Sequence, residues 1–129
     1  HFIYRYDIEK EEVSSLVGMG MNACIKDHPE IEALLDTPDG IARDINGNLY
    51  IAERSAIRKI NIYEKTTETL FELNHLNYDY FNSVTVMPDS SAVFYSNGSD
   101  IMIIENNESY WVAGVSYDPD IRDGCLEEC

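Results

Sequence analysis

The stretch TPDGIARDINGNLYIAE, residues 37–53, decides the fold because a similar stretch, FNSVTVMPDSSAVFYSN, follows at residues 81–97. Each copy holds two short apolar runs separated by a cluster of turn-forming residues, which is typical of a β-hairpin. The alignment places Asp39 on Asn82 and the second copy about 44 residues after the first, a spacing found in structural repeats. The sequence therefore indicates a repeat architecture rather than a single hairpin.

The repeat extends beyond this hairpin in both directions. AIRKINIYEKTTETLFEL (56–73) matches DIMIIENNESYWVAG (100–114), and FIYRYDIEKEEVSSLVG (2–18) resembles the second half of the same unit. A connector also occurs twice, since IKDHPEIEA (25–33) resembles IRDGCLEEC (121–129). The two complete units thus contain four strand-length runs each, at residues 40–44, 48–53, 57–63 and 69–73 and at residues 83–87, 92–96, 101–105 and 110–113.

Four strands per unit and a period of about 44 residues predict an all-β fold of β-propeller blades, each a sheet of four antiparallel strands. One such sheet cannot bury both of its faces, whereas sheets stacked around an axis bury both. A β-sandwich of hairpins is the alternative, although a sandwich requires no sequence repeat. The chain supplies about two and a half blades, fewer than the four to eight of closed propellers, so we expect a partial or incomplete ring.

We treat residues 1–129 as a single propeller segment. It is expected to be a fragment of a longer protein, because it starts within a blade and stops before a new first strand. The remaining blades of its own chain or a second copy are then expected partners. The predicted parts are an outer half-blade (1–18), a connector (19–35), a blade (36–74), a second blade (78–114) and a second connector (115–129).

The first complete unit resembles the NHL repeat, a β-propeller family. The second unit fits less well, because Ser83 stands where the family has glycine and Asn97 where it has an acidic residue. The resemblance covers nearly the whole chain, and it is more specific for the fold than for a function. It rests on PDGIARD (38–44), GNLYIAE (47–53) and IRKI (57–60), and on YWVAG (110–114) with RDG (122–124), which are similar to the family's inter-blade stretch.

The charge and the resemblance together suggest the class of partner. Acidic residues outnumber basic ones 24 to 9, and the formal net charge is −15. Such a surface repels phosphate backbones, so no nucleic acid is expected as a partner. No apolar run is long enough to span a membrane. The resemblance implies a binding platform formed by loops at one end of a central channel. We therefore expect a non-catalytic recognition module for a protein or peptide, with no cofactor.

Asp39 and Asn82 are the candidate metal ligands of an alternative, enzymatic interpretation. The neighbouring propeller families are the regucalcin and gluconolactonase lactonases, the strictosidine-synthase-like proteins and the amidating lyase. The lactonases place oxygen ligands for a divalent cation at the starts of inner strands, where Asp39 and Asn82 stand. Such ligands suit Ca²⁺ or Mg²⁺, and the cation could polarise a lactone carbonyl or activate water. The lactonases hold these ligands in Pro-Asp-Gly and Asn-Gly contexts, which Asp39 in PDG and Asn82 in FNS meet in the opposite order along the chain. No third ligand is identifiable.

The cellular compartment is only weakly indicated. Three cysteines, Cys24, Cys125 and Cys129, do not define a disulfide framework, so their pairing is left open. The triplets NGS and NES fit the N-glycosylation pattern at Asn97 and Asn107. These features lean toward a secreted protein and leave an extracellular structural or adhesive ectodomain as a third interpretation.

Several further residues carry local expectations. Gly40 and Gly47 are expected at the bends of the first hairpin, and neither Ser14 and Ser15 nor Ser90 and Ser91 have a paired base nearby in the sequence. The three histidines show no metal-ligand spacing. The aromatic residues Tyr110 and Trp111 are expected to pack between blades, as bulky rings on outer strands do.

Overall fold

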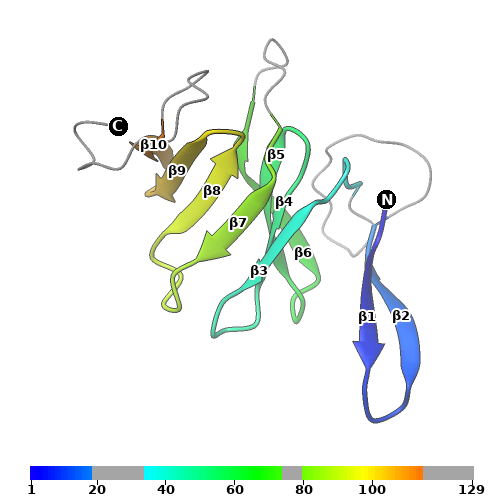
Figure 1. Ribbon diagram of the computed structural model, residues 1–129. Helices are drawn as coiled ribbons and strands as arrows, with labels where there is room; N and C mark the ends of the chain where they lie inside the picture. The colour runs from blue at the N-terminus through cyan, green and yellow to red at the C-terminus, as the bar shows by residue number, and fades with distance from the viewer. Residues whose placement is uncertain (19–33, 74–79, 115–129) are drawn as a thin grey trace.

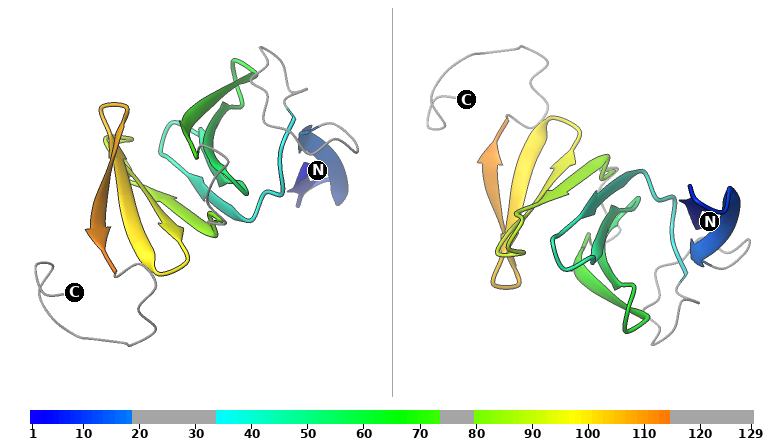
Figure 2. Two further views of the ribbon diagram at one scale, coloured as in Figure 1. Left: turned by 90° about the horizontal axis from the view of Figure 1, so that it is seen from above. Right: turned by 90° about the horizontal axis from the view of Figure 1, so that it is seen from below.

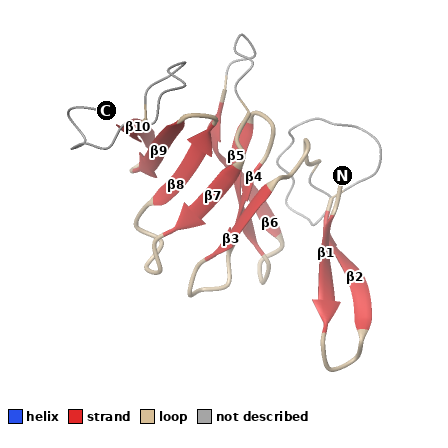
Figure 3. Ribbon diagram, in the orientation of Figure 1, coloured by secondary structure: helices blue, strands red, loops and turns tan. Residues whose placement is uncertain are grey.

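The computed structural model describes residues 1–18, 34–73 and 80–114, and the regular elements within them are β-strands (Figures 1 and 3). The strands form three antiparallel sheets that follow one another in chain order. The described strands are β1 (Ile3–Asp7), β2 (Glu12–Val17), β3 (Gly40–Arg43), β4 (Leu49–Ala52), β5 (Ala56–Asn61), β6 (Thr66–Glu72), β7 (Ser83–Val86), β8 (Val93–Asn97), β9 (Asp100–Glu105) and β10 (Glu108–Ala113).

Two of the sheets have the composition of propeller blades. One has the strand order β3-β4-β5-β6 and the other β7-β8-β9-β10, with every neighbour antiparallel. The repeated hairpin of the sequence is therefore β3–β4 in one sheet and β7–β8 in the other. This confirms the prediction of an all-β fold made of four-stranded antiparallel blades.

The hairpin β1–β2 corresponds to the outer half of a blade. In each outer hairpin the pairing register shifts once and skips one residue of the last strand. The skipped residues are Leu16 of β2, Leu70 of β6 and Val112 of β10, so all three outer hairpins are irregular at the same position. Gly18 and Gly114 share a second feature, because both have positive φ and both press against the start of the partner strand. A Cβ on Gly18 would lie 2.2 Å from a carbonyl oxygen, and one on Gly114 would lie 2.1 Å from another.

The division of the chain into parts stays a prediction. The connectors expected at 19–35 and 115–129 fall almost entirely outside the described residues, which include only Leu34 and Leu35 of the first connector. What the structure does give is the order of the strand groups. In the two views of Figure 2, the hairpin β1–β2, the sheet β3–β6 and the sheet β7–β10 stand side by side in chain order.

The main core lies between the two four-stranded sheets. Tyr50 and Ala52 of β4 pack there against Val93 and Tyr95 of β8, and all four are buried. Aromatic rings add to this core, with Phe81 edge-on to Tyr95 at a centroid distance of 4.9 Å. Burial of each such side chain stabilises the fold by about 1.5–3 kcal/mol. Within the described residues, the inter-sheet contact is thus the larger of the two apolar cores.

A second core attaches the hairpin β1–β2 to the sheet β3–β6. Val17 of β2 and Leu35 pack there against Leu49 and Ile51, the β4 residues that alternate with those of the main core. Side chains on successive strand positions point to opposite faces, so β4 serves both cores. This explains why all four residues of β4 are buried.

Gly40 and Gly47 have different roles, and the expectation of a bend at both was wrong for Gly40. Gly47 has φ 88° and sits in the turn between β3 and β4. Gly40 instead begins β3, where a Cβ would lie 2.9 Å from the Cα of Ser83 in β7. Glycine is needed here because the first strands of the two sheets approach each other closely.

Tyr110 and Trp111 are not packed between the two described blades, in contrast to the expectation. Their exposed fractions are 47% and 46%. Both lie on β10, the outermost strand of its sheet. Tyr110 pairs with Ile103, whose face of the sheet is not covered by a described strand, so its ring stays half exposed.

Candidate functional site

The predicted site residues lie at one edge of the two blades, which we call the loop edge. It consists of the segment before β3 (36–39), the β4–β5 turn (53–55), the segment before β7 (80–82) and the β8–β9 turn (97–99). In a propeller these segments surround one mouth of the central channel. The loop edge is therefore the place where a ligand would meet several blades at once.

Asp39 and Asn82 occupy equivalent positions on this edge. The Asp39 N–H donates to the carbonyl of Ala52 at 2.9 Å, and the Asn82 N–H donates to the carbonyl of Ser96 at 3.1 Å. The close approach at Gly40 brings the two segments together, since a Cβ there would lie 3.0 Å from the carbonyl oxygen of Asn82. Both side chains are exposed.

These two residues form an incomplete ligand set. The Asn82 side-chain oxygen accepts a hydrogen bond from the N–H of Gly98 at 3.2 Å, so it is already used in its own blade. Within residues 1–18, 34–73 and 80–114, no group of three or more His, Cys, Asp or Glu side chains is arranged to hold a metal ion. Two oxygen donors are fewer than the six to eight that Ca²⁺ takes.

Arg54 and Tyr80 form a contact on the loop edge that the sequence did not suggest. The Arg54 guanidinium donates to the Tyr80 hydroxyl at 3.0 Å and lies 5.1 Å from the centre of the ring. The hydrogen bond raises the pKa of Arg54 above its usual value, so the cation persists at every physiological pH. The two residues are 26 positions apart and come from different blades, which is why spacing alone could not pair them.

Glu53 and Arg58 form a buried ion pair beneath the loop edge. Both side chains are fully buried, with 3.6 Å between Arg58 Nη1 and Glu53 Oε1. Glu53 also accepts the N–H of Asp36 at 2.9 Å, and Arg58 donates to the carbonyl of Leu34 at 3.4 Å. The pair therefore fixes the segment before β3 to the sheet, and with it the position of Asp39.

Asp44 is the centre of a buried polar cluster at the opposite edge. Its carboxylate accepts bonds from the Asn48 side-chain amide at 2.7 Å, from the Ser90 hydroxyl at 2.7 Å and from the Tyr50 hydroxyl at 3.3 Å. Burial raises the pKa of Asp44, but the hydrogen bonds from Asn48, Ser90 and the backbone outweigh it and hold the pKa at about 2. The carboxylate is thus ionised at neutral pH.

The bond from Ser90 crosses from one blade to the other. Ser90 follows β7 and Asp44 follows β3, so the pair joins two turns that are 46 positions apart in sequence. The serine without a nearby base in the sequence therefore contacts a carboxylate in the fold. A carboxylate with a pKa of about 2 is a poor base, so this arrangement suits a link between blades better than nucleophilic catalysis.

Several candidate residues fall outside the described part of the chain. Cys24, Cys125 and Cys129 are among them, as are His28 and His75. Within the described residues, no helix is long and apolar enough to cross a membrane.

Both potential glycosylation residues are described. Asn107 is exposed in the β9–β10 turn, whereas Asn97 is partly buried at the end of β8. Their modification remains a prediction.

The chain resembles solved β-propeller proteins in fold. No family model and no curated protein matches it. A structural genomics protein of unknown function from Bacteroides thetaiotaomicron superposes with a TM-score of 0.61 at 17% identity, over 74% of this chain and 27% of the other. A chain of a mitotic checkpoint complex superposes with a TM-score of 0.52 at 14% identity, over 79% of this chain and 36% of the other.

These similarities establish the fold alone. The solved neighbours are β-propeller proteins, and this chain corresponds to a partial set of their blades. It spans only 27% and 36% of the length of the two structures described above.

Proposed function

We propose that the chain is an NHL-type propeller segment that acts as a non-catalytic recognition module and binds a protein or peptide at its loop edge. The NHL-like pattern of residues 38–60 supports the family assignment. The four-stranded sheets and their close approach at Gly40 supply the rigid base that such a platform needs.

The exposed Arg54–Tyr80 pair is the observation that carries the proposal. Arginine and tyrosine are enriched among the residues that dominate protein–protein binding. Here they are held together at the junction of two blades and next to the polar positions Asp39 and Asn82. A peptide could pack an apolar side chain on Tyr80 and place its polar groups against the neighbouring carboxylate and amide.

A displayed library of random peptides tests this proposal. Peptides selected on the whole chain should lose at least about tenfold in affinity when Arg54 and Tyr80 are both replaced by Ala, equivalent to about 1.4 kcal/mol by titration calorimetry. Tyr63→Ala is the matched control, since Tyr63 is an exposed tyrosine in the β5–β6 turn at the opposite edge. Equal affinity for both variants, or a loss with Tyr63→Ala alone, would contradict the proposal.

A metal-dependent hydrolase or lyase of the lactonase type is the second candidate. The equivalent placement of Asp39 and Asn82 at neighbouring first strands favours it. The ligand set is incomplete among the described residues, so we derive no reaction step through a metal. Titration of the chain with Ca²⁺ and Mg²⁺ is the test. This candidate fails if no heat of binding appears, or if Asp39→Ala and Asn82→Ala leave the binding unchanged.

A further inference from the structure

Every four-stranded sheet of this chain has two different faces. We call the face turned toward the following strands the forward face, and the face turned toward the preceding strands the rear face. At the junction inside the molecule, Tyr50 and Ile57 on the forward face of β3–β6 pack against Tyr95 and Ile104 on the rear face of β7–β10. A forward face therefore meets a rear face, and this junction serves as the internal standard for any further contact.

The forward face of β7–β10 is uncovered by the described strands. Val93, Tyr95 and Ile104 point into the core, so the residues that alternate with them in β8 and β9 point away from it. Among these, Ile101 has 47% of its surface exposed. The exposed face is formed by Phe94, Ser96, Ile101 and Ile103, with Tyr110 beside Ile103.

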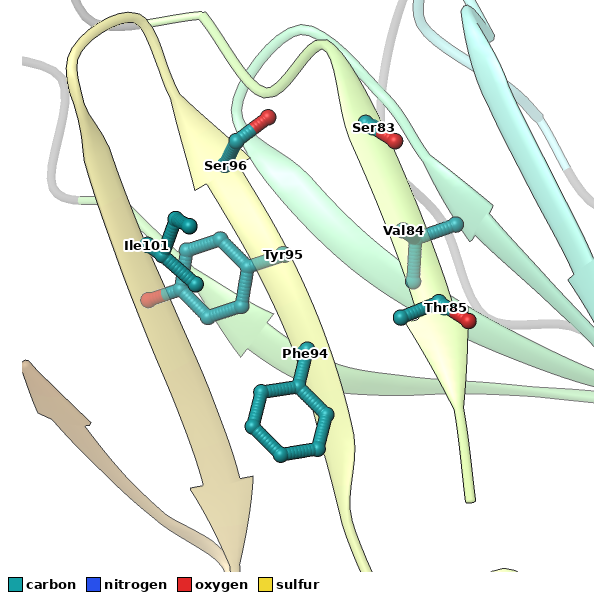
Figure 4. A pocket seen from close by; sticks show the side chains of 7 residues that line it. All are labelled: Ser83, Val84, Thr85, Phe94, Tyr95, Ser96 and Ile101. Carbon is teal, nitrogen blue, oxygen red and sulfur yellow. The ribbon is translucent and has the colours of Figure 1, made fainter. Parts of the chain in front are cut away.

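This forward face is also hollowed. A depression of about 160 Å³ lies over β7, β8 and the start of β9, and its walls are mainly apolar. Figure 4 shows the side chains that line it on the three neighbouring strands. The lining residues are Ser83, Val84, Thr85, Phe94, Tyr95, Ser96 and Ile101.

The hairpin β1–β2 presents a rear face that no described strand covers. Ile3 packs toward the second core, so Tyr4 and Tyr6 point the other way. Tyr6 pairs with Val13 of β2, and their exposed fractions are 57% and 67%. Phe2 extends the row, with its ring centre 5.8 Å from that of Tyr4. Three neighbouring aromatic rings form an apolar patch that is unusual on a solvent-exposed strand.

We infer that the forward face of β7–β10 binds the rear face of β1–β2 from a second copy of this chain, head to tail. Both surfaces are apolar. One is a forward face and the other is a rear face, and a forward face packs against a rear face at the internal junction. The contact is heterologous, because two different surfaces of the same chain form it.

Ser83 favours the half-blade β1–β2 over a complete blade as the occupant. At the internal junction the first strand of the next blade approaches so closely that Gly40 has no room for a Cβ. Ser83 is the equivalent first residue of β7 and carries a Cβ. A complete blade docked in the same way would bring its first strand onto that Cβ. The hairpin β1–β2 corresponds to outer strands only, so it would cover β9 and β10 and leave the hollow over β7 and β8 open.

The charge of the chain opposes this association and gives it a characteristic salt dependence. Two copies with a formal charge of −15 each repel one another. The hairpin ends that would meet are acidic. Glu9 and Glu11 lie between β1 and β2, and Glu105 at the end of β9 pairs with Glu108 at the start of β10. Added salt screens this repulsion, so association should become tighter as the salt concentration rises.

Sedimentation equilibrium of the whole chain and its single-face variants tests the inference. Wild type should self-associate with increasing protein concentration. Tyr6→Glu places a charge on the apolar rear face, and Ile101→Glu places one on the apolar forward face. Each variant should weaken self-association at least about tenfold. Tyr63→Glu is the control, since Tyr63 is exposed in a turn and belongs to neither face, and it should associate as wild type does.

A mixture of the two variants gives the decisive result. Tyr6→Glu keeps an intact forward face and Ile101→Glu keeps an intact rear face, so an equimolar mixture should form dimers although neither variant does so alone. If Ile101→Glu loses its β-sheet circular dichroism, Tyr110→Glu takes its place on the same face. A wild type that stays monomeric at every salt concentration overturns the inference. So does a Tyr6→Glu variant that dimerises by itself, or a mixture of folded variants that stays monomeric.

Discussion

The two complete blades share their strand pattern and differ in their polar interior. In the first, the buried pair Glu53–Arg58 holds the segment before β3. In the second, the corresponding positions carry Asn97 and Met102, which cannot form an ion pair. Both sheets nevertheless have four strands, and the outer hairpin of each carries a bulge at the same place.

This difference separates what forms a blade from what attaches other parts to it. The alternation of apolar residues and the turn residues are common to both blades, so they are sufficient for the strand pattern. The polar clusters of the first blade have a different role, because they attach neighbouring segments of the chain to the blade. Glu53 and Arg58 bind the incoming segment, and Asp44 binds the turn of the next blade through Ser90.

The largest effect is expected from breaking the ion pair. Arg58→Ala leaves the fully buried Glu53 without its cation and should lower the free energy of unfolding by about 3–5 kcal/mol. Urea unfolding followed by circular dichroism measures it. The double variant Glu53→Asn with Arg58→Met gives the first blade the residues of the second and should recover more than half of the loss. A single-variant loss below about 1 kcal/mol would contradict a stabilising role for the pair.

The close approach of the first strands should make one position in β3 sensitive and its counterpart in β7 tolerant. Gly40→Ala places a Cβ 2.9 Å from the Cα of Ser83 and should cost about 1–3 kcal/mol through displacement of the two strands. Ser83→Ala, at the equivalent position on the uncovered forward face, should change stability by less than about 0.5 kcal/mol. Thermal unfolding of both variants checks the contrast, and equal shifts would show that the strands do not meet so closely in solution.

Val84 and Ile41 are a second pair of equivalent positions, and their side chains are buried to different extents. Val84 is buried against the first blade, whereas 57% of Ile41 is exposed, because β1–β2 corresponds to outer strands and leaves the inner strand β3 uncovered. Val84→Ala should therefore cost about 2 kcal/mol, and Ile41→Ala should lie within about 0.5 kcal/mol of wild type. Urea midpoints provide the comparison. An equal cost at both positions would mean that Ile41 is covered in solution.

The smallest effect is the pH dependence that Asp44 contributes. Its pKa falls from the ordinary 3.8 to about 2 on folding, so the folded state favours the ionised carboxylate. The resulting stability is fully present above about pH 5 and disappears as the pH falls through 2. It amounts to about 2.4 kcal/mol at neutral pH, of which about 1 kcal/mol is lost by pH 3. Asp44→Asn should therefore be less stable than wild type at pH 7, and the difference should shrink in acid. A difference that is constant between pH 7 and pH 3 would rule out this linkage.

The repeat made the fold predictable, and long-range contacts limited the prediction of the site. Strand and turn patterns act over a few residues, so the beginning of β3 at Gly40 and of β7 at Ser83 could be predicted closely. The equivalence of Asp39 and Asn82 followed from the same alignment. The bonds from Ser90 to Asp44 and from Arg54 to Tyr80 join positions 46 and 26 residues apart, and no local pattern encodes such partners.

Burial on the outer strands was the least predictable feature. Tyr110 and Trp111 are large aromatic residues of the kind that cores contain. Whether they are buried depends on what covers their strand. The role of Gly40 was hidden for a similar reason. A glycine that avoids a neighbouring strand has the same sequence context as a glycine in a turn, and only the position of β7 distinguishes them.

The narrow attachment of the hairpin β1–β2 has a consequence for how the molecule opens. Among the described residues its buried contact with the sheet β3–β6 is made through Val17, with Ile3 and Leu16 alongside, whereas the blades share an extensive core. Local opening takes the least free energy where few apolar contacts are lost. The hairpin is therefore the first element expected to exchange its amide protons. A strand pair that detaches without unfolding its neighbour is also suited to domain swapping, in which it docks on another molecule in the place it left on its own.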